Sequence, residues 1–251
     1  MITMAPDPNQ TSRVIDLEAL RGEGISTAPN AAVAVLDTSE VRWFAVGSPA
    51  VEVVDWFTGW GRHGTLEERC DVYQSHHLQD IGVKRRSRDA LEVKVRRAIG
   101  ESLVLQPGLA APFEEWRKWS PDDTDPMSPS PDIPWIDIHK VILTRTFMLD
   151  GGEVVGPAPH IDDTLSGCDV EIVEVTVERT RSWSLAFEAF GPKSDRRRAV
   201  TFSWDALVAD SGPFENLGSY FDQPAGYPEW LVVIASEMGA APEQSTDQLT
   251  G

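Results

Sequence analysis

The sequence has few cysteines and no long apolar run. Its two cysteines, Cys70 and Cys168, stand far apart among 251 residues and lack the spacing of a metal site. Isolated cysteines are typical of a reducing compartment, so we expect a cytoplasmic protein without a disulfide framework. No stretch of about 18 consecutive apolar residues is present, so we expect no membrane-spanning helix and no membrane partner.

Positive charge is also scarce, and it is unevenly distributed. The chain has 22 lysines and arginines against 40 aspartates and glutamates, a net charge of −18. No lysine or arginine follows Arg198, whereas seven basic residues lie between Lys84 and Arg97. So acidic a chain is not expected to bind nucleic acid generally, because affinity for the phosphate backbone depends on lysine and arginine. The concentrated basic segment instead predicts a local site for a small anion.

The length and composition favour a single folded domain. Residues 1–30 are polar and rich in proline, asparagine and glycine, which predicts a flexible N-terminal arm. Residues 31–238 have the size and apolar content of one domain. The last residues, 239–251, are predicted to form a disordered tail. The oligomeric state is left open.

Alternating apolar and polar residues predict a mainly β, α+β fold. Seven strands are expected over residues 34–46, 70–74, 82–86, 90–97, 140–148, 169–179 and 182–191, with residues 200–204 as an eighth. Helices are expected near residues 51–57 and 228–236. Residues 120–134 are rich in proline, serine and aspartate and are expected to form an exposed loop.

Charged residues follow one face of several of these strands. In residues 91–96, Glu92, Lys94 and Arg96 alternate with three apolar side chains. Combined over several strands, this pattern predicts a closed or nearly closed antiparallel barrel of eight strands with its charges inside. Such a lumen would hold ions or a polyanion, since unpaired buried charge is costly. A plain β-sandwich with one solvated charged face is the alternative.

The order of these segments resembles the CYTH superfamily, the triphosphate tunnel metalloenzymes that include class IV adenylate cyclases and thiamine triphosphatases. The resemblance rests on Asp71-x-Tyr73, on the Gly-Val-Lys-Arg-Arg strand from Gly82, and on Leu-Glu-Val-Lys-Val-Arg from Leu91. A later strand with Arg145 and a late strand with Glu188 complete it. The resemblance implies an eight-stranded tunnel with a few peripheral helices, in which inward acids bind Mg²⁺ or Mn²⁺ and inward bases bind a triphosphate.

Residue by residue, the resemblance and the alternation together predict a set of roles. The expected substrate-binding residues are Arg42, Lys84, Arg86, Lys94, Arg96 and Arg145. The expected catalytic residues are Glu40, Glu92 and Glu188. The expected metal ligands are Glu40, Glu174 and Glu188, with Glu171 as a substitute for one of them. The predicted function is binding and hydrolysis of a triphosphate-bearing small molecule or of inorganic polyphosphate.

The sequence departs from the family at both acidic motifs. Where the family has Glu-x-Glu-x-Lys, this chain has Glu40, Arg42 and Phe44, and the late Glu-x-Glu reads Glu188 and Phe190. Roughly half of the family's metal-binding carboxylates are therefore replaced. This favours the alternative function, a non-catalytic protein that binds a phosphoanion after losing part of its metal site.

Two further motifs are set aside. The segment from Gly59 to Gly64 matches the glycine pattern of dinucleotide-binding turns, but it follows a predicted helix and precedes none, which is the wrong context. His76 and His77 are adjacent, and neighbouring strand residues point to opposite faces, so they are not expected to share a metal ion.

Overall fold

A computed structural model of the chain describes residues 33–61, 63–75, 78–86, 90–121, 134–154 and 165–239. Its strands are β1 (Val33–Val46), β2 (Thr65–Gln74), β3 (Ile81–Arg86), β4 (Ala90–Gln106), β5 (Leu109–Pro121), β6 (Trp135–Met148), β7 (Gly152–Val154), β8 (Gly167–Val177), β9 (Thr180–Phe190) and β10 (Gln223–Pro224). Its helices are α1 (Val51–Phe57), α2 (Lys193–Ser211), the 3-10 turn η1 (Leu217–Tyr220) and α3 (Tyr227–Gly239).

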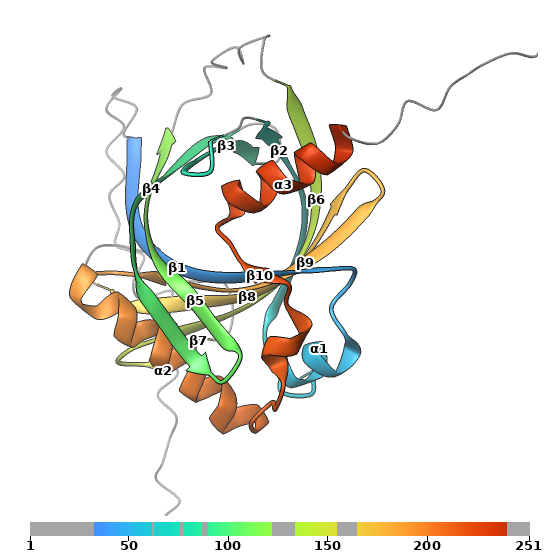
Figure 1. The fold of residues 1–251 in the computed structure, drawn as a ribbon. Coiled ribbons are helices and arrows are strands. Elements are labelled where there is room, and N and C mark those ends of the chain that lie inside the picture. The colour runs from blue at the N-terminus through green and yellow to red at the C-terminus, as the bar shows by residue number, and fades with distance from the viewer. Residues whose placement is uncertain are drawn as a thin grey trace, which may run out of the picture. The chain divides into compact units, whose positions relative to one another are not determined.

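Eight of these strands form a closed antiparallel barrel. Their order is β1-β5-β4-β3-β2-β6-β8-β9, and β9 pairs back with β1 to complete the ring. The short strands β7 and β10 extend β6 and β1. Figure 1 shows the ring along its axis. The predicted eight-stranded barrel is confirmed, which is the fold that the CYTH resemblance implies, and the sandwich alternative is wrong.

The eighth strand is not the predicted one. Residues 200–204 lie inside α2, whose buried residues Ala199, Val200, Ser203, Trp204 and Leu207 recur at helical spacing. The missing barrel strand is β5, which forms a long hairpin with β4. The hairpin turns at Pro107-Gly108, where Gly108 has a φ of +80°, a conformation that glycine adopts without strain.

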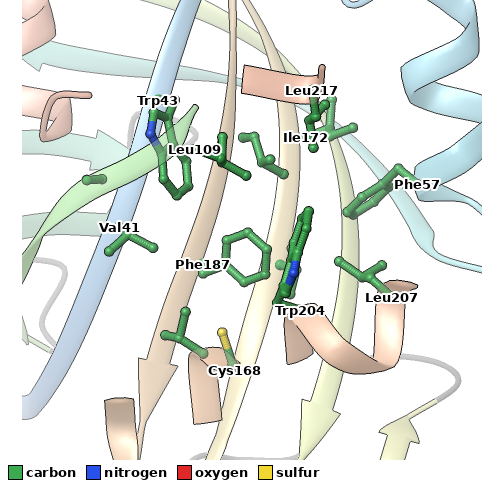
Figure 2. Packing of buried hydrophobic residues seen from close by; sticks show 14 of the residues in the cluster. Val41, Trp43, Phe57, Leu109, Cys168, Ile172, Phe187, Trp204, Leu207 and Leu217 are labelled. Carbon is green, nitrogen blue, oxygen red and sulfur yellow. The ribbon is translucent and has the colours of Figure 1, made fainter. Parts of the chain in front are cut away.

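One hydrophobic core lies outside the barrel. The outward side chains of β1, β8 and β9 pack against α2, which runs along the barrel wall (Figure 1). Figure 2 shows its centre, where Trp204 and Leu207 of α2 meet Phe187 of β9 and Ile172 of β8. The rings of Phe187 and Trp204 meet edge to face, with centroids 6.3 Å apart. This core anchors the wall that carries Glu40, Glu188 and Glu171 on its other face.

A second core fills part of the barrel interior. Here α3 crosses the barrel opening (Figure 1) and buries Trp230, Leu231 and Ile234 among lumen-facing side chains of β6 and β8. The Trp230 ring stacks on Phe44 of β1 at a centroid distance of 4.8 Å. Part of the lumen is therefore apolar and filled, while the remainder is lined by charged residues.

Several predictions fall outside the described residues. The arm of residues 1–30, most of the loop expected at residues 120–134, and His76 and His77 are among these. Of the predicted tail 239–251, only Gly239 is described, as the last residue of α3. These assignments stay predictions. Within the described part of the chain, no helix has the length and apolarity needed to cross a membrane.

Candidate functional site

The charged part of the lumen contains a cavity of about 110 Å³. Tyr227 and Pro228, at the start of α3, and the apolar Ile142 and Val173 form part of its wall. Its basic lining residues are Arg42, Arg69, Lys84, Arg86, Lys94, Lys118 and Lys140, and its acidic lining residues are Glu40, Glu92, Glu171 and Glu188. Seven bases thus face four acids, an excess of positive charge within a strongly acidic protein.

Lys94 joins two carboxylates from different strands. Its Nζ lies 2.5 Å from Glu40 Oε2 and 3.2 Å from Glu188 Oε1. Glu40 and Glu188 are directly paired in the β1–β9 ladder, so the barrel closure itself brings the two carboxylates together. The other oxygen of Glu40 accepts a 2.6 Å hydrogen bond from Arg42 Nε.

These contacts fix the charge states of the three groups. Burial opposes ionisation of Glu188, but Lys94, Lys118 and Arg42 together outweigh burial and hold the pKa of Glu188 well below its usual range. Burial likewise disfavours the charged form of Lys94, yet Glu188 and Glu40 together raise the pKa of Lys94. All three groups are therefore ionised at neutral pH.

A second network surrounds the fully buried Asp71. Its Oδ2 lies 3.3 Å from both Lys140 Nζ and Arg69 Nε and 3.9 Å from Lys84 Nζ. Lys84 in turn forms a 2.8 Å ion pair with Glu92. Burial alone would raise the pKa of Glu92, but Lys84 and Lys118 outweigh it and lower the pKa to about 2. Glu92 is thus a permanent anion held between bases.

Two bases of the lining are paired only loosely. Arg86 Nη2 lies 3.9 Å from Glu92 Oε2, and Lys118 Nζ lies 3.7 Å from the same oxygen. Both separations exceed a hydrogen bond. The Arg86 side chain is also 45% exposed, which places it at the solvent side of the cavity. These two side chains are the ones best able to turn toward an incoming anion.

Most of the predicted site residues come together in this cavity. Glu40, Arg42, Lys84, Arg86, Glu92, Lys94 and Glu188 all line it. Arg96 has the predicted inward parity, but it does not line the cavity. Its guanidinium forms a 2.5 Å ion pair with Glu114, pairs with Asp80 and lies 3.4 Å from Glu229 of α3. Arg96 therefore lies outside the cavity that the other predicted residues share, and its contacts connect β4 to β5 and α3.

Arg145 is a clear correction, because it lies on the outer face of β6. Its guanidinium donates two hydrogen bonds to Glu153, at 2.7 and 2.6 Å, and one of 2.9 Å to the carbonyl of Phe57. Asp210 of α2 lies 3.3 Å away. Strand residues alternate in direction, so Lys140 and Ile142 point into the cavity while Arg145 points away. Arg145 joins the α1 region and β7 to α2 and binds no lumen ligand.

Glu174 is a second correction, for the same reason. It is two residues from Ile172 of the outer core and one residue from Val173 of the cavity wall. Its parity therefore places it on the outside of β8, where its ladder partners are Val141 and Trp183. The carboxylate of β8 that does line the cavity is Glu171.

Three basic lining residues were not predicted from the sequence. Arg69 lies just before the strand expected at residues 70–74, and Lys140 is the first residue of the strand expected at 140–148, because both strands were predicted too short. Lys118 lies in β5, which was not predicted as a strand. The alternation of β6 could have predicted that Lys140 faces the lumen, since Lys140 lies on the same face of the strand as Ile142 and on the opposite face from Arg145.

The divalent ion implied by the resemblance does not fit these carboxylates. Magnesium needs oxygen ligands that converge on one point. Here an ammonium group lies between Glu40 and Glu188, and the remaining oxygen of Glu40 is bound to Arg42. Glu174, the third predicted ligand, lies outside the barrel. Among the residues that the structure describes, no three acidic, histidine or cysteine side chains are grouped to hold a metal.

Comparison with known proteins adds one structural likeness. No protein-family model matches the chain, and no curated protein matches it by sequence. Among solved structures, the RNA triphosphatase Pct1 of S. pombe, in complex with the Spt5 CTD, is similar. The likeness has 11% identity and a TM-score of 0.36, and it covers 68% of this chain and 77% of that one. A likeness of this size supports no inference about activity.

Proposed function

We propose that the barrel binds a phosphorylated anion, such as inorganic tripolyphosphate or the triphosphate end of a small molecule. The observation that carries the proposal is the excess of bases: seven line the cavity against four acids, and the buried Asp71, which contacts Lys140, Arg69 and Lys84, brings the acids only to five. Guanidinium and ammonium groups are the side chains best suited to phosphate oxygens. A multiply charged anion bound in the cavity would balance this excess of positive charge.

The size of the cavity supports a ligand that enters by a narrow, charged end. Pockets for complete drug-sized ligands span roughly 300–1,000 Å³. The cavity of about 110 Å³ is far smaller, and α3 occupies the neighbouring part of the lumen. The charged phosphate groups would therefore lie inside, with any organic group near the solvent side by Arg86.

Metal-dependent hydrolysis, the activity expected from the resemblance, is not part of this proposal. Of the predicted metal ligands, Glu40 and Glu188 are engaged by Lys94, and Glu174 lies on the outside of β8. The proposal therefore corresponds to the alternative drawn from the sequence, a phosphoanion-binding protein that has lost part of a metal site.

The test uses two neighbouring bases on opposite faces of β5. Lys118 lines the cavity, whereas Arg117 lies on the other face and pairs with Asp37 at 2.6 Å. Titration calorimetry of tripolyphosphate should show that Lys118→Ala weakens binding by roughly 10- to 150-fold, since a charge-assisted hydrogen bond contributes about 1.5–3 kcal/mol. Arg117→Ala removes the same charge one residue away and should leave the affinity unchanged.

Two results would contradict the proposal. One is that tripolyphosphate gives neither binding heat nor a raised melting temperature with the wild-type protein, because a ligand of the folded state must stabilise it. The other is an equal loss of affinity in both variants, which would indicate attraction to general surface charge. Phosphate release measured on the same samples should stay at the uncatalysed level.

A further inference from the structure

The contacts of Lys94 place a positive charge where two carboxylates meet. Glu40 comes from β1 and Glu188 from β9, and these strands are ladder partners. Lys94 reaches them from β4, which is separated from β1 by β5. Its ammonium contacts one oxygen of each carboxylate, at 2.5 and 3.2 Å. A side chain from across the interior thus supplies the cation for this pair.

The same arrangement recurs at the other acidic position of the lumen. Lys84 Nζ lies 2.8 Å from Glu92 and 3.9 Å from Asp71, so a lysine again lies between two carboxylates. Arg42 also contacts Glu40, and Lys140 and Arg69 also contact Asp71. Each of these four carboxylates, Glu40, Glu188, Glu92 and Asp71, therefore contacts a base of the protein itself. A lysine of the chain thus lies at each of the two places in the lumen where carboxylates come together, Lys94 at one and Lys84 at the other.

A divalent ion could occupy the first position only by displacing Lys94. The displaced ammonium would have to remain charged inside the barrel, because its side chain is only 19% exposed, or lose its proton there. Both outcomes are unfavourable, since removing one partner of a buried ion pair strands the other charge.

We infer that the cavity binds its phosphoanion without a divalent metal, with Lys94 as the fixed cation that bridges Glu40 and Glu188. The inference rests on the proposed function and deepens it. Lys94 keeps the two carboxylates from repelling phosphate, so it acts on the ligand through them as well as by its own charge.

The first experiment compares binding of tripolyphosphate to the wild-type protein in excess EDTA and in excess magnesium, by titration calorimetry. We expect binding in EDTA to be at least as tight as in magnesium, since magnesium neutralises the ligand. Binding that requires magnesium would overturn the inference and leave the proposed function standing. Absence of binding in both buffers would instead overturn the proposed function, and the inference with it.

The second experiment removes the fixed cation. Lys94→Ala should bind tripolyphosphate at least about tenfold more weakly in EDTA, and manganese should restore part of the loss by entering between Glu40 and Glu188. Manganese titration followed by electron paramagnetic resonance should show binding to Lys94→Ala and none to the wild type. Lys118→Ala is the matched control, because it loses one lining charge but leaves the carboxylates paired. Its affinity should fall without rescue by manganese.

Manganese binding by the wild type, or an equal manganese response in both variants, would contradict the inference. Should Lys94→Ala fail to fold, the wild-type comparison between EDTA and magnesium still decides the question.

Discussion

Asp169 offers a direct test of the electrostatics of the barrel wall. It lies on β8, where it pairs with Glu188 of β9, and it accepts a 2.6 Å hydrogen bond from Thr146. Burial raises the pKa of Asp169 to about 7, and repulsion from Glu171 and Glu188 adds to the shift, although the Thr146 hydrogen bond opposes it. Asp169 should therefore change its charge near neutral pH.

The sign of the effect follows from the direction of this shift. The pKa of Asp169 in the folded chain lies above the ordinary 3.8, so the folded chain holds a proton that the unfolded chain has lost. The stability that this proton confers is complete below about pH 4 and is lost as the pH rises through about 7. At ~1.4 kcal/mol per pKa unit, the difference in the pKa of Asp169 between the folded and unfolded chains lowers the free energy of unfolding, relative to its value below about pH 4, by about 2 kcal/mol at about pH 5.5 and by about 4 kcal/mol at about pH 8.5.

Asp169→Asn removes this penalty while keeping an oxygen that accepts the Thr146 hydrogen bond. Urea denaturation should show that the variant is more stable than the wild type, and that the difference grows by about 2 kcal/mol between about pH 5.5 and about pH 8.5. Asp37→Asn is the control, because hydrogen bonding to Arg117 lowers the pKa of Asp37 and keeps it ionised at both pH values. A stability difference for Asp169→Asn that is constant with pH would refute the reasoning.

Two further predictions concern charges that the structure places in different roles. Arg145→Met should lower the free energy of unfolding by about 3–5 kcal/mol in urea denaturation, because it removes the buried cation that Glu153 and Asp210 contact, and it should not change affinity for tripolyphosphate. An altered affinity with unaltered stability would contradict this assignment. Glu188→Gln should tighten tripolyphosphate binding in titration calorimetry, because it removes a negative charge from the cavity and frees a contact of Lys94. Weaker binding would indicate that Glu188 contacts the ligand favourably.

The barrel was largely predictable because strand alternation is a local signal. In β4, strict alternation predicted that Glu92 and Lys94 face inward, and both line the cavity. The signal failed in β5, where Trp116 and Trp119 fall on opposite faces and hide the alternation. It also failed at residues 200–204, where β-branched and aromatic residues resemble a strand although the surrounding nineteen-residue segment forms α2.

The site was predictable in residue type but not in partners. Arg145 and Glu174 were chosen because they lie in strands and carry the right charge, yet each lies one position out of register with the lumen-facing residues of its strand. A shift of one residue reverses the face on which a side chain lies. The contacts of Lys94 with Glu40 and Glu188 could not be derived from residue spacing in the sequence, because they depend on the pairing of β1 with β9 that closes the barrel. These strands are far apart in the sequence: Arg42 and Ser184, which are hydrogen-bonded across them, are separated by 142 residues.

The two halves of the lumen show that the fold itself does not require buried charge. Around Trp230 and Val175, this chain fills the interior with apolar side chains and closes it with α3. Replacing buried ion pairs by packed apolar residues of similar volume is often neutral or stabilising, so the charged half is not explained by stability. Its bases also exceed its acids, whereas a purely structural network would need only matched pairs. The two loosely paired bases, Arg86 at the solvent side and Lys118, are therefore best explained by an anion that enters from outside.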